Sequence, residues 1–174
     1  MFWKKYKDII LITVLFLLIR LPFLDQLFLL HDERDIVLSG YSIAKTARDL
    51  YGNFLPINFE ELNPHNPATA IYFSALWWTF LPRTVFFARL PYVLITSLLV
   101  PLVYLIVKKV LQNKEIAILS AFFAAFNPWM FHITRLAMDI NVTLVAGLFG
   151  IYLFMNRKYI FSFVMWLLFV KRCS

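Results

Sequence analysis

The chain has 174 residues, of which 61% are hydrophobic and 16% charged, and its mean hydropathy is +0.74. A soluble domain of this length has too much surface to cover with so few polar side chains, so soluble, disordered and disulfide-scaffold proteins are excluded. The formal net charge is +7, and the basic residues stand in short clusters between apolar runs, as in the cytoplasmic loops of membrane proteins rather than in a nucleic-acid-binding surface.

The first apolar run follows a basic N-terminus. Lys4, Lys5 and Lys7 precede residues 9–30, a stretch longer than the apolar region of a signal peptide and not followed by a small-residue cleavage site. We therefore expect an uncleaved first transmembrane helix over residues 9–30.

Two amphipathic helices are expected in the loop that follows, residues 31–85. Apolar residues within 36–51 recur at helical spacing, with polar residues on the opposite face. Residues 67–81 are apolar but fall short of the roughly 20 residues that cross a bilayer. We expect an interfacial helix there, with Trp77 and Trp78 at headgroup depth.

The remaining apolar runs end on basic residues. We expect spans at about 86–107, 116–131 and 140–155, and a partial span at 159–170. The positive-inside rule places the N-terminus, 108–114 and 157–158 in the cytoplasm, and hence the loop 31–85 and residues 132–139 outside. The sequence thus predicts an all-α polytopic membrane protein of four to five transmembrane helices. Because 159–170 is too short to cross, we expect the chain to be the truncated N-terminal part of a larger domain.

The strongest candidate for chemistry is the run of ionisable residues 31–35, directly after the first span. Carboxylates at a low-dielectric boundary can act as general bases. The alternative is that Asp32 or Asp35 caps the helix at 36–51.

Other candidates face the same outer side. Arg135 and Asp139 either form a local ion pair, or Asp139 faces the loop after the first span and Arg135 binds an anionic group. His65 lies in a proline-rich loop and Arg89 near the mouth of the second span, and each has an ordinary surface or headgroup interpretation as well.

In this order and spacing, the motifs resemble the N-terminal part of a C-type membrane glycosyltransferase, similar to the dolichyl-phosphate-mannose protein mannosyltransferases and the lipid A aminoarabinose transferases of glycosyltransferase family 39. The matching segments are Asp32-Glu33, the helix at 36–51, His65-Asn66-Pro67-Ala68, Ala88-Arg89-Leu90-Pro91, and Arg135 with Asp139. Two of them depart from the family pattern: Asn66 replaces a proline, and Arg135 and Asp139 stand one residue closer.

The resemblance implies transfer of a sugar from a polyprenyl-phosphate donor to a protein, lipid or glycan acceptor at the outer face. In this scheme Asp32 is the general base, Glu33 supports it, and Asp139 is a second acidic residue near the sugar or acceptor. Arg135, with Arg89 or His65, offsets charge on the leaving phosphate. Assistance by a divalent metal stays open, because no ligand set stands out.

Two other functions were considered. A non-enzymatic helical scaffold or accessory protein predicts that Asp32 and Asp139 are far apart in water. A lipid carrier or flippase would need ionisable residues at mid-membrane depth, and the spans have almost none. We expect an integral protein of the bacterial plasma membrane with a cytoplasmic N-terminus, although the endoplasmic reticulum obeys the same charge rule. As this chain alone, we expect little transferase activity.

Overall fold

The computed structural model describes residues 2–56, 59 and 68–170, and within them all regular structure is helical. One isolated bridge pairs Arg48 with Phe54. The helices are α1 (Phe2–Arg20), α2 (His31–Thr46), α3 (Ala68–Trp78), α4 (Val85–Thr96), α5 (Leu99–Leu111), α6 (Lys114–Phe126), α7 (Pro128–Ile133), α8 (Asp139–Met155) and α9 (Tyr159–Val170). The all-α prediction is confirmed.

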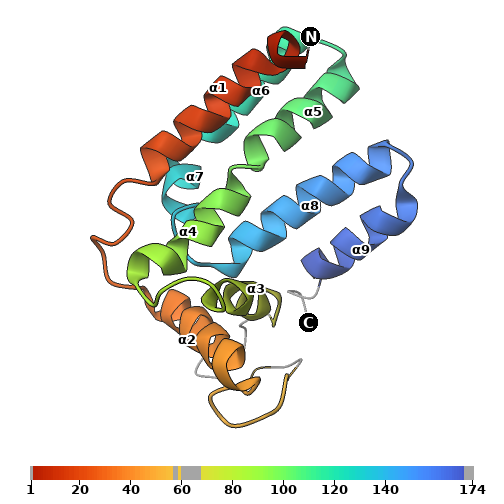
Figure 1. The fold of residues 1–174 in the computed structure, drawn as a ribbon. Coiled ribbons are helices and arrows are strands. Elements are labelled where there is room, and N and C mark those ends of the chain that lie inside the picture. The colour runs from red at the N-terminus through yellow and green to blue at the C-terminus, as the bar shows by residue number, and fades with distance from the viewer. Residues whose placement is uncertain (1, 57–58, 60–67, 171–174) are drawn as a thin grey trace.

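The helices form one bundle with a cap at one end (Figure 1). Helices α1, α5 and α6 pack together, and Ala117, Ala121 and Ala125 form a small-residue stripe on α6 that lets them approach closely. Helix α8 packs on α4 and α5 and forms a hairpin with α9, while α2 and α3 cross the end of the bundle opposite the N-terminus.

The first helix is shorter than the sequence predicts. Helix α1 ends at Arg20, so the expected helix over 9–30 is wrong for residues 21–30, which run without regular structure to α2. Pro22 explains the stop, because a proline disfavours helical geometry in the residue before it. The ten-residue connection, here called the first loop (21–30), becomes important for the site.

The second expected span is confirmed as a helical segment, with a break. Helices α4 and α5 meet at Ser97 and Leu98, four and three residues before Pro101. Proline has no N–H to donate to the carbonyl of Ser97, and its ring clashes with that carbonyl. Taken together, Val85–Leu111 is the one segment of the described chain long and apolar enough to cross a membrane by length and composition. The number of spans therefore stays a prediction.

The third expected span, 116–131, is interrupted. Pro128 holds Asn127 in an extended conformation (φ −62°, ψ 125°), which ends α6. The Asn127 side chain then accepts hydrogen bonds from the backbone N–H groups of Trp129 and Met130 and starts α7 in a new direction.

The amphipathic helix after the first loop begins five residues earlier than expected. Helix α2 starts at His31, so Asp32 and Asp35 lie inside the helix and the capping interpretation is wrong for both. Glu33 is the residue whose side chain caps the start of the helix, because its Oε2 accepts a hydrogen bond from Leu30 N at 3.0 Å.

Helices α2 and α3 touch at Gly40. A Cβ at this position would lie 2.7 Å from Ser74 Cβ and 3.0 Å from the Ile71 carbonyl oxygen. Only a glycine permits this approach without movement of the α3 backbone.

We predict that Gly40→Ala destabilises the chain by about 1–3 kcal/mol despite the better helix propensity of alanine, because the methyl group pushes α2 from α3. Thermal unfolding in detergent measures the effect. Adding Ser74→Gly makes room for the methyl group and should recover most of the loss. Equal stability of wild type and Gly40→Ala would show that the two helices separate without cost.

Candidate active site

The centre of the capped end is a buried ion pair between α2 and α4. Arg89 donates to Glu33 through two bonds, Nε to Oε1 at 2.9 Å and Nη2 to Oε2 at 2.7 Å. The Glu33 side chain is fully buried and that of Arg89 is 5% exposed. A bidentate pair of this kind fixes both side chains in one orientation.

Every N–H of the Arg89 guanidinium is used. Besides Glu33, it donates to the carbonyl oxygens of Leu24 (2.7 Å), Leu27 (3.1 Å) and Phe28 (3.2 Å) in the first loop. Because a guanidinium has five N–H groups, none is left for a phosphate in this arrangement. The structure thus gives Arg89 the geometry of a positioning residue that holds the first loop.

Glu33 also joins α2 to the segment before α8. Its Oε1 accepts a hydrogen bond from Ala137 N at 2.7 Å, so its carboxylate receives four bonds in all. Asp32 is the exposed residue next to Glu33, and Asp139 is the partly buried first residue of α8, two residues after Ala137. The bond between Glu33 and Ala137 therefore joins the two chain segments that carry these carboxylates.

Arg135 holds the start of the first loop. It lies in the turn between α7 and α8, and its Nη2 donates to the carbonyl oxygens of Pro22 (2.8 Å) and Phe23 (3.0 Å). Within the described residues its Nε and Nη1 have no hydrogen-bond acceptor. Burial, and then the positive charge of Arg89, lower the pKa of Arg135 from its ordinary value.

A third guanidinium lies behind these two. Arg20, at the end of α1, is fully buried and donates to Thr134 Oγ1 at 2.8 Å and to the Ala125 carbonyl oxygen at 2.7 Å. Its guanidinium carbon lies 3.6 Å from the centre of the Phe16 ring. Arg20 ties α1 to the end of α6 and to the turn that presents Arg135.

Between the first loop and α7 lies a cavity of about 180 Å³, which we call the arginine pocket. Its polar lining consists of Gln26, Arg89, His132 and Arg135, and it has no carboxylate. Phe23, Leu24, Leu27, Phe131 and Leu136 complete it. A pocket lined by two guanidiniums, a histidine and an amide suits a small anion such as a phosphate group.

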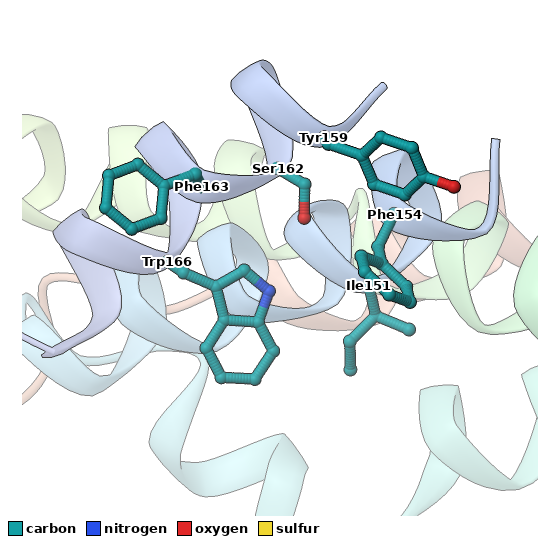
Figure 2. A pocket seen from close by; sticks show the side chains of 6 residues that line it. All are labelled: Ile151, Phe154, Tyr159, Ser162, Phe163 and Trp166. Carbon is teal, nitrogen blue, oxygen red and sulfur yellow. The ribbon is translucent and has the colours of Figure 1, made fainter. Parts of the chain in front are cut away.

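Larger hollows lie away from this chemistry. Figure 2 shows one of about 510 Å³ between α8 and α9, lined by Ile151, Phe154, Tyr159, Ser162, Phe163 and Trp166. The Ser162 hydroxyl in it already donates to the Gly150 carbonyl oxygen at 2.8 Å. Another, of about 400 Å³, lies between α5 and α8 and has an almost wholly apolar lining. Neither contains a carboxylate, an imidazole or a guanidinium.

Of the six residues singled out in the sequence, the structure brings Glu33 and Arg89 into direct contact and places Arg89 and Arg135 in the lining of one pocket. Asp32 and Asp139 lie close in the chain to Glu33 and Ala137, which are joined by a hydrogen bond. His65 lies outside the described residues. Sequence reasoning missed His132 and Gln26, whose only signal was their position beside apolar segments on the outer side. Among the residues described, no group of three or more His, Cys, Asp or Glu side chains is placed to hold a metal ion.

Comparison with known proteins gives one match. A family model described as dolichyl-phosphate-mannose-protein mannosyltransferase matches residues 51–171, about two thirds of the chain. No curated protein and no solved structure matches.

Proposed function

The chain belongs to the dolichyl-phosphate-mannose-protein mannosyltransferase family, a family of glycosyltransferases, and from this premise we propose that it transfers a sugar from a polyprenyl-phosphate carrier to a hydroxyl acceptor at the outer face of a membrane. The observation that supports this function best is the arginine pocket, whose Arg89 is paired with the acidic first turn of α2 that carries Asp32. A phosphate-linked sugar needs a cationic site for the phosphate and an acidic residue for the reacting hydroxyl.

The arginine pocket is the proposed phosphate site. Arg135 lines it, and among the described residues the Nε and Nη1 of Arg135 have no hydrogen-bond acceptor, while His132 and Gln26 add further polar groups. Repulsion between Arg89 and Arg135 is relieved when an anion enters, because the anion attracts both guanidiniums. Arg89 contributes its charge to the pocket, while its N–H groups donate to Glu33 and to carbonyl oxygens of the first loop.

Asp32 is the proposed general base. Its carboxylate takes the proton of the acceptor hydroxyl while the hydroxyl oxygen attacks the anomeric carbon. The bond from that carbon to the phosphate oxygen breaks, and its electron pair leaves on the polyprenyl phosphate. Arg135 stabilises this negative charge, while Asp139 lies near the sugar or acceptor, whose ring carbon becomes positive in the transition state.

The surroundings of the pocket suit a donor that arrives from the bilayer. Phe23, Leu27 and Phe28 of the first loop are 67%, 67% and 95% exposed. Exposed aromatic and aliphatic side chains of this size are stable against lipid and costly in water. The carrier phosphate can then reach Arg135 while its isoprenoid chain stays in the membrane.

The lysine clusters at the ends of α1, α5 and α6 lie at the opposite end of the bundle. Lys109 Nζ donates to the Met155 carbonyl oxygen at 2.6 Å, and Lys114 pairs with Asp8 at 3.2 Å. These contacts bring together the ends of α1, α5, α6 and α8 that carry the lysine clusters. By the positive-inside rule this end is proposed to face the cytoplasm.

We predict that Arg135→Gln weakens binding of a polyprenyl-phosphate-mannose donor by about 10- to 100-fold, the value of one charged hydrogen-bonded contact. Binding of the radiolabelled donor to the whole chain in nanodiscs measures it. Arg157→Gln makes the same change of charge at the other end of the bundle and should leave the affinity within about twofold. Equal loss in both variants would mean that the lipid binds by overall charge and not at the pocket.

A further inference from the structure

The first turn of α2 contains a buried carboxylate that the proposed mechanism does not use. Asp35 is 2% exposed, and its Oδ2 has no hydrogen-bond partner. A buried carboxylate oxygen without a hydrogen-bond partner destabilises the folded state, so its presence calls for a functional explanation. The His31 ring lies one helical turn away, with its Nε2 4.0 Å from this oxygen.

The hydrogen bond at the other nitrogen of His31 fixes the position of its proton. Nδ1 lies 2.9 Å from Arg34 Nη2. Arginine has only N–H donors, so Nδ1 must offer its lone pair, and in the neutral ring the proton is on Nε2. This Nε2–H faces Asp35. Because the His31 side chain is 59% exposed, a ring movement of about 1 Å brings the pair from 4.0 Å to a hydrogen-bond distance of about 2.9 Å.

We propose that Asp35 accepts the Nε2–H of His31 and so holds Nδ1 as a hydrogen-bond acceptor for a substrate hydroxyl beside Asp32. Asp35 is then a positioning residue, and a hydroxyl that donates to Nδ1 replaces the Arg34 N–H at the protein surface. A carboxylate that fixes a histidine tautomer in this way is a common device of active sites. The proposal rests on the proposed transferase function only for the source of the hydroxyl, which is the sugar, because Asp32 takes the single proton of the acceptor hydroxyl.

Nitrogen NMR of the ring tests the tautomer without any transfer assay. The chain has three histidines, so the single variants His65→Gln and His132→Gln assign the signals. In the whole chain labelled with ¹⁵N-histidine in detergent, we expect an observable Nε2–H of His31 and an unprotonated Nδ1. Asp35→Asn should speed exchange of the Nε2 proton by at least about tenfold, because it removes the carboxylate acceptor. The indole signals of the tryptophans report whether this variant keeps its fold.

Arg34→Gln is the matched control. It removes the donor to Nδ1 but leaves Asp35, so the Nε2–H tautomer should persist. A proton on Nδ1 in the wild type, or loss of the tautomer in Arg34→Gln but not in Asp35→Asn, would overturn the proposal.

Two probes distinguish the source of the hydroxyl. Methyl mannoside represents the sugar and a threonine-containing peptide represents a protein acceptor. We expect methyl mannoside to shift Nδ1 of His31 in the wild type but not in Asp35→Asn, and the peptide to leave it unchanged; a shift with the peptide alone would contradict the assignment of the hydroxyl to the sugar. No shift with either probe at high concentration would reject hydroxyl binding. Arg135→Gln should leave the tautomer unchanged, so failure of donor binding and failure of this proposal are separate results.

Discussion

Arg89→Met is expected to destabilise the chain by about 3–5 kcal/mol, the largest effect on stability that the structure predicts. The substitution leaves Glu33 charged and buried without its partner, and breaking a buried ion pair in this way costs far more than the pair contributes when intact. It also removes the donors to three carbonyl groups of the first loop. Reversible unfolding in mixed micelles measures the difference.

The chain supplies its own comparison for this experiment. Lys114 and Asp8 form an ion pair at 3.2 Å with side chains 52% and 48% exposed, so Asp8→Asn should cost less than about 1 kcal/mol. The double variant Arg89→Met, Glu33→Met removes both buried charges and should be more stable than Arg89→Met alone. If Arg89→Met costs no more than Asp8→Asn, the pair is not buried in the membrane-embedded protein.

Asp32→Asn is expected to lower sugar transfer by about 10²- to 10⁴-fold, which corresponds to about 2.7–5.5 kcal/mol of transition-state stabilisation. The amide cannot accept the hydroxyl proton, while the size of the side chain is kept. Since the sequence predicts slow turnover by this chain, the rate is measured in a single turnover with protein in excess over labelled donor.

Donor affinity separates a chemical role of Asp32 from a binding role. Asp32→Asn should bind the polyprenyl-phosphate-mannose donor within about twofold of wild type, because Asp32 lies outside the arginine pocket lining. Asp25→Asn changes another exposed carboxylate, in the first loop, and should transfer at the wild-type rate. Equal rates in Asp32→Asn and wild type would assign the base to another residue.

Much of the helical framework was predictable from the sequence, and the breaks were the main errors. Apolar runs and basic clusters located α4–α5, α8 and α9 closely, because these segments follow composition. The ends of α1 and α6 depend on Pro22 and Pro128, whose local effect overrides an apolar run that continues beyond them. Helix α2 begins early because Glu33 reaches back to Leu30 N, a contact that the hydrophobic pattern does not contain.

The site was predictable as a set of residues and not as a set of contacts. Asp32, Glu33, Arg89 and Arg135 were recognised, yet the contacts of Glu33, Arg89 and Arg135 include partners 56 to 113 residues away in the chain. Position in the sequence did not reveal that Glu33 and Arg89 bind each other. Several acidic and basic residues lie near the ends of the expected spans, and any of them could form the pair. His132 lines the arginine pocket only because α7 runs in a different direction from α6. Asn127 and Pro128 cause this change of direction.

The hydrogen bond from Ala137 N to Glu33 also has a consequence for biosynthesis. Its two residues are 104 positions apart, so at roughly 5–20 residues per second Glu33 is made about 5–20 s before Ala137. The same interval separates synthesis of Arg20 from that of Ala125, whose carbonyl oxygen it binds 105 positions later. During this interval the nascent chain carries charged groups on α1 and α2 that still lack these partners. The nascent chain therefore has to keep Arg20 and Glu33 hydrated until the later helices arrive to cover them.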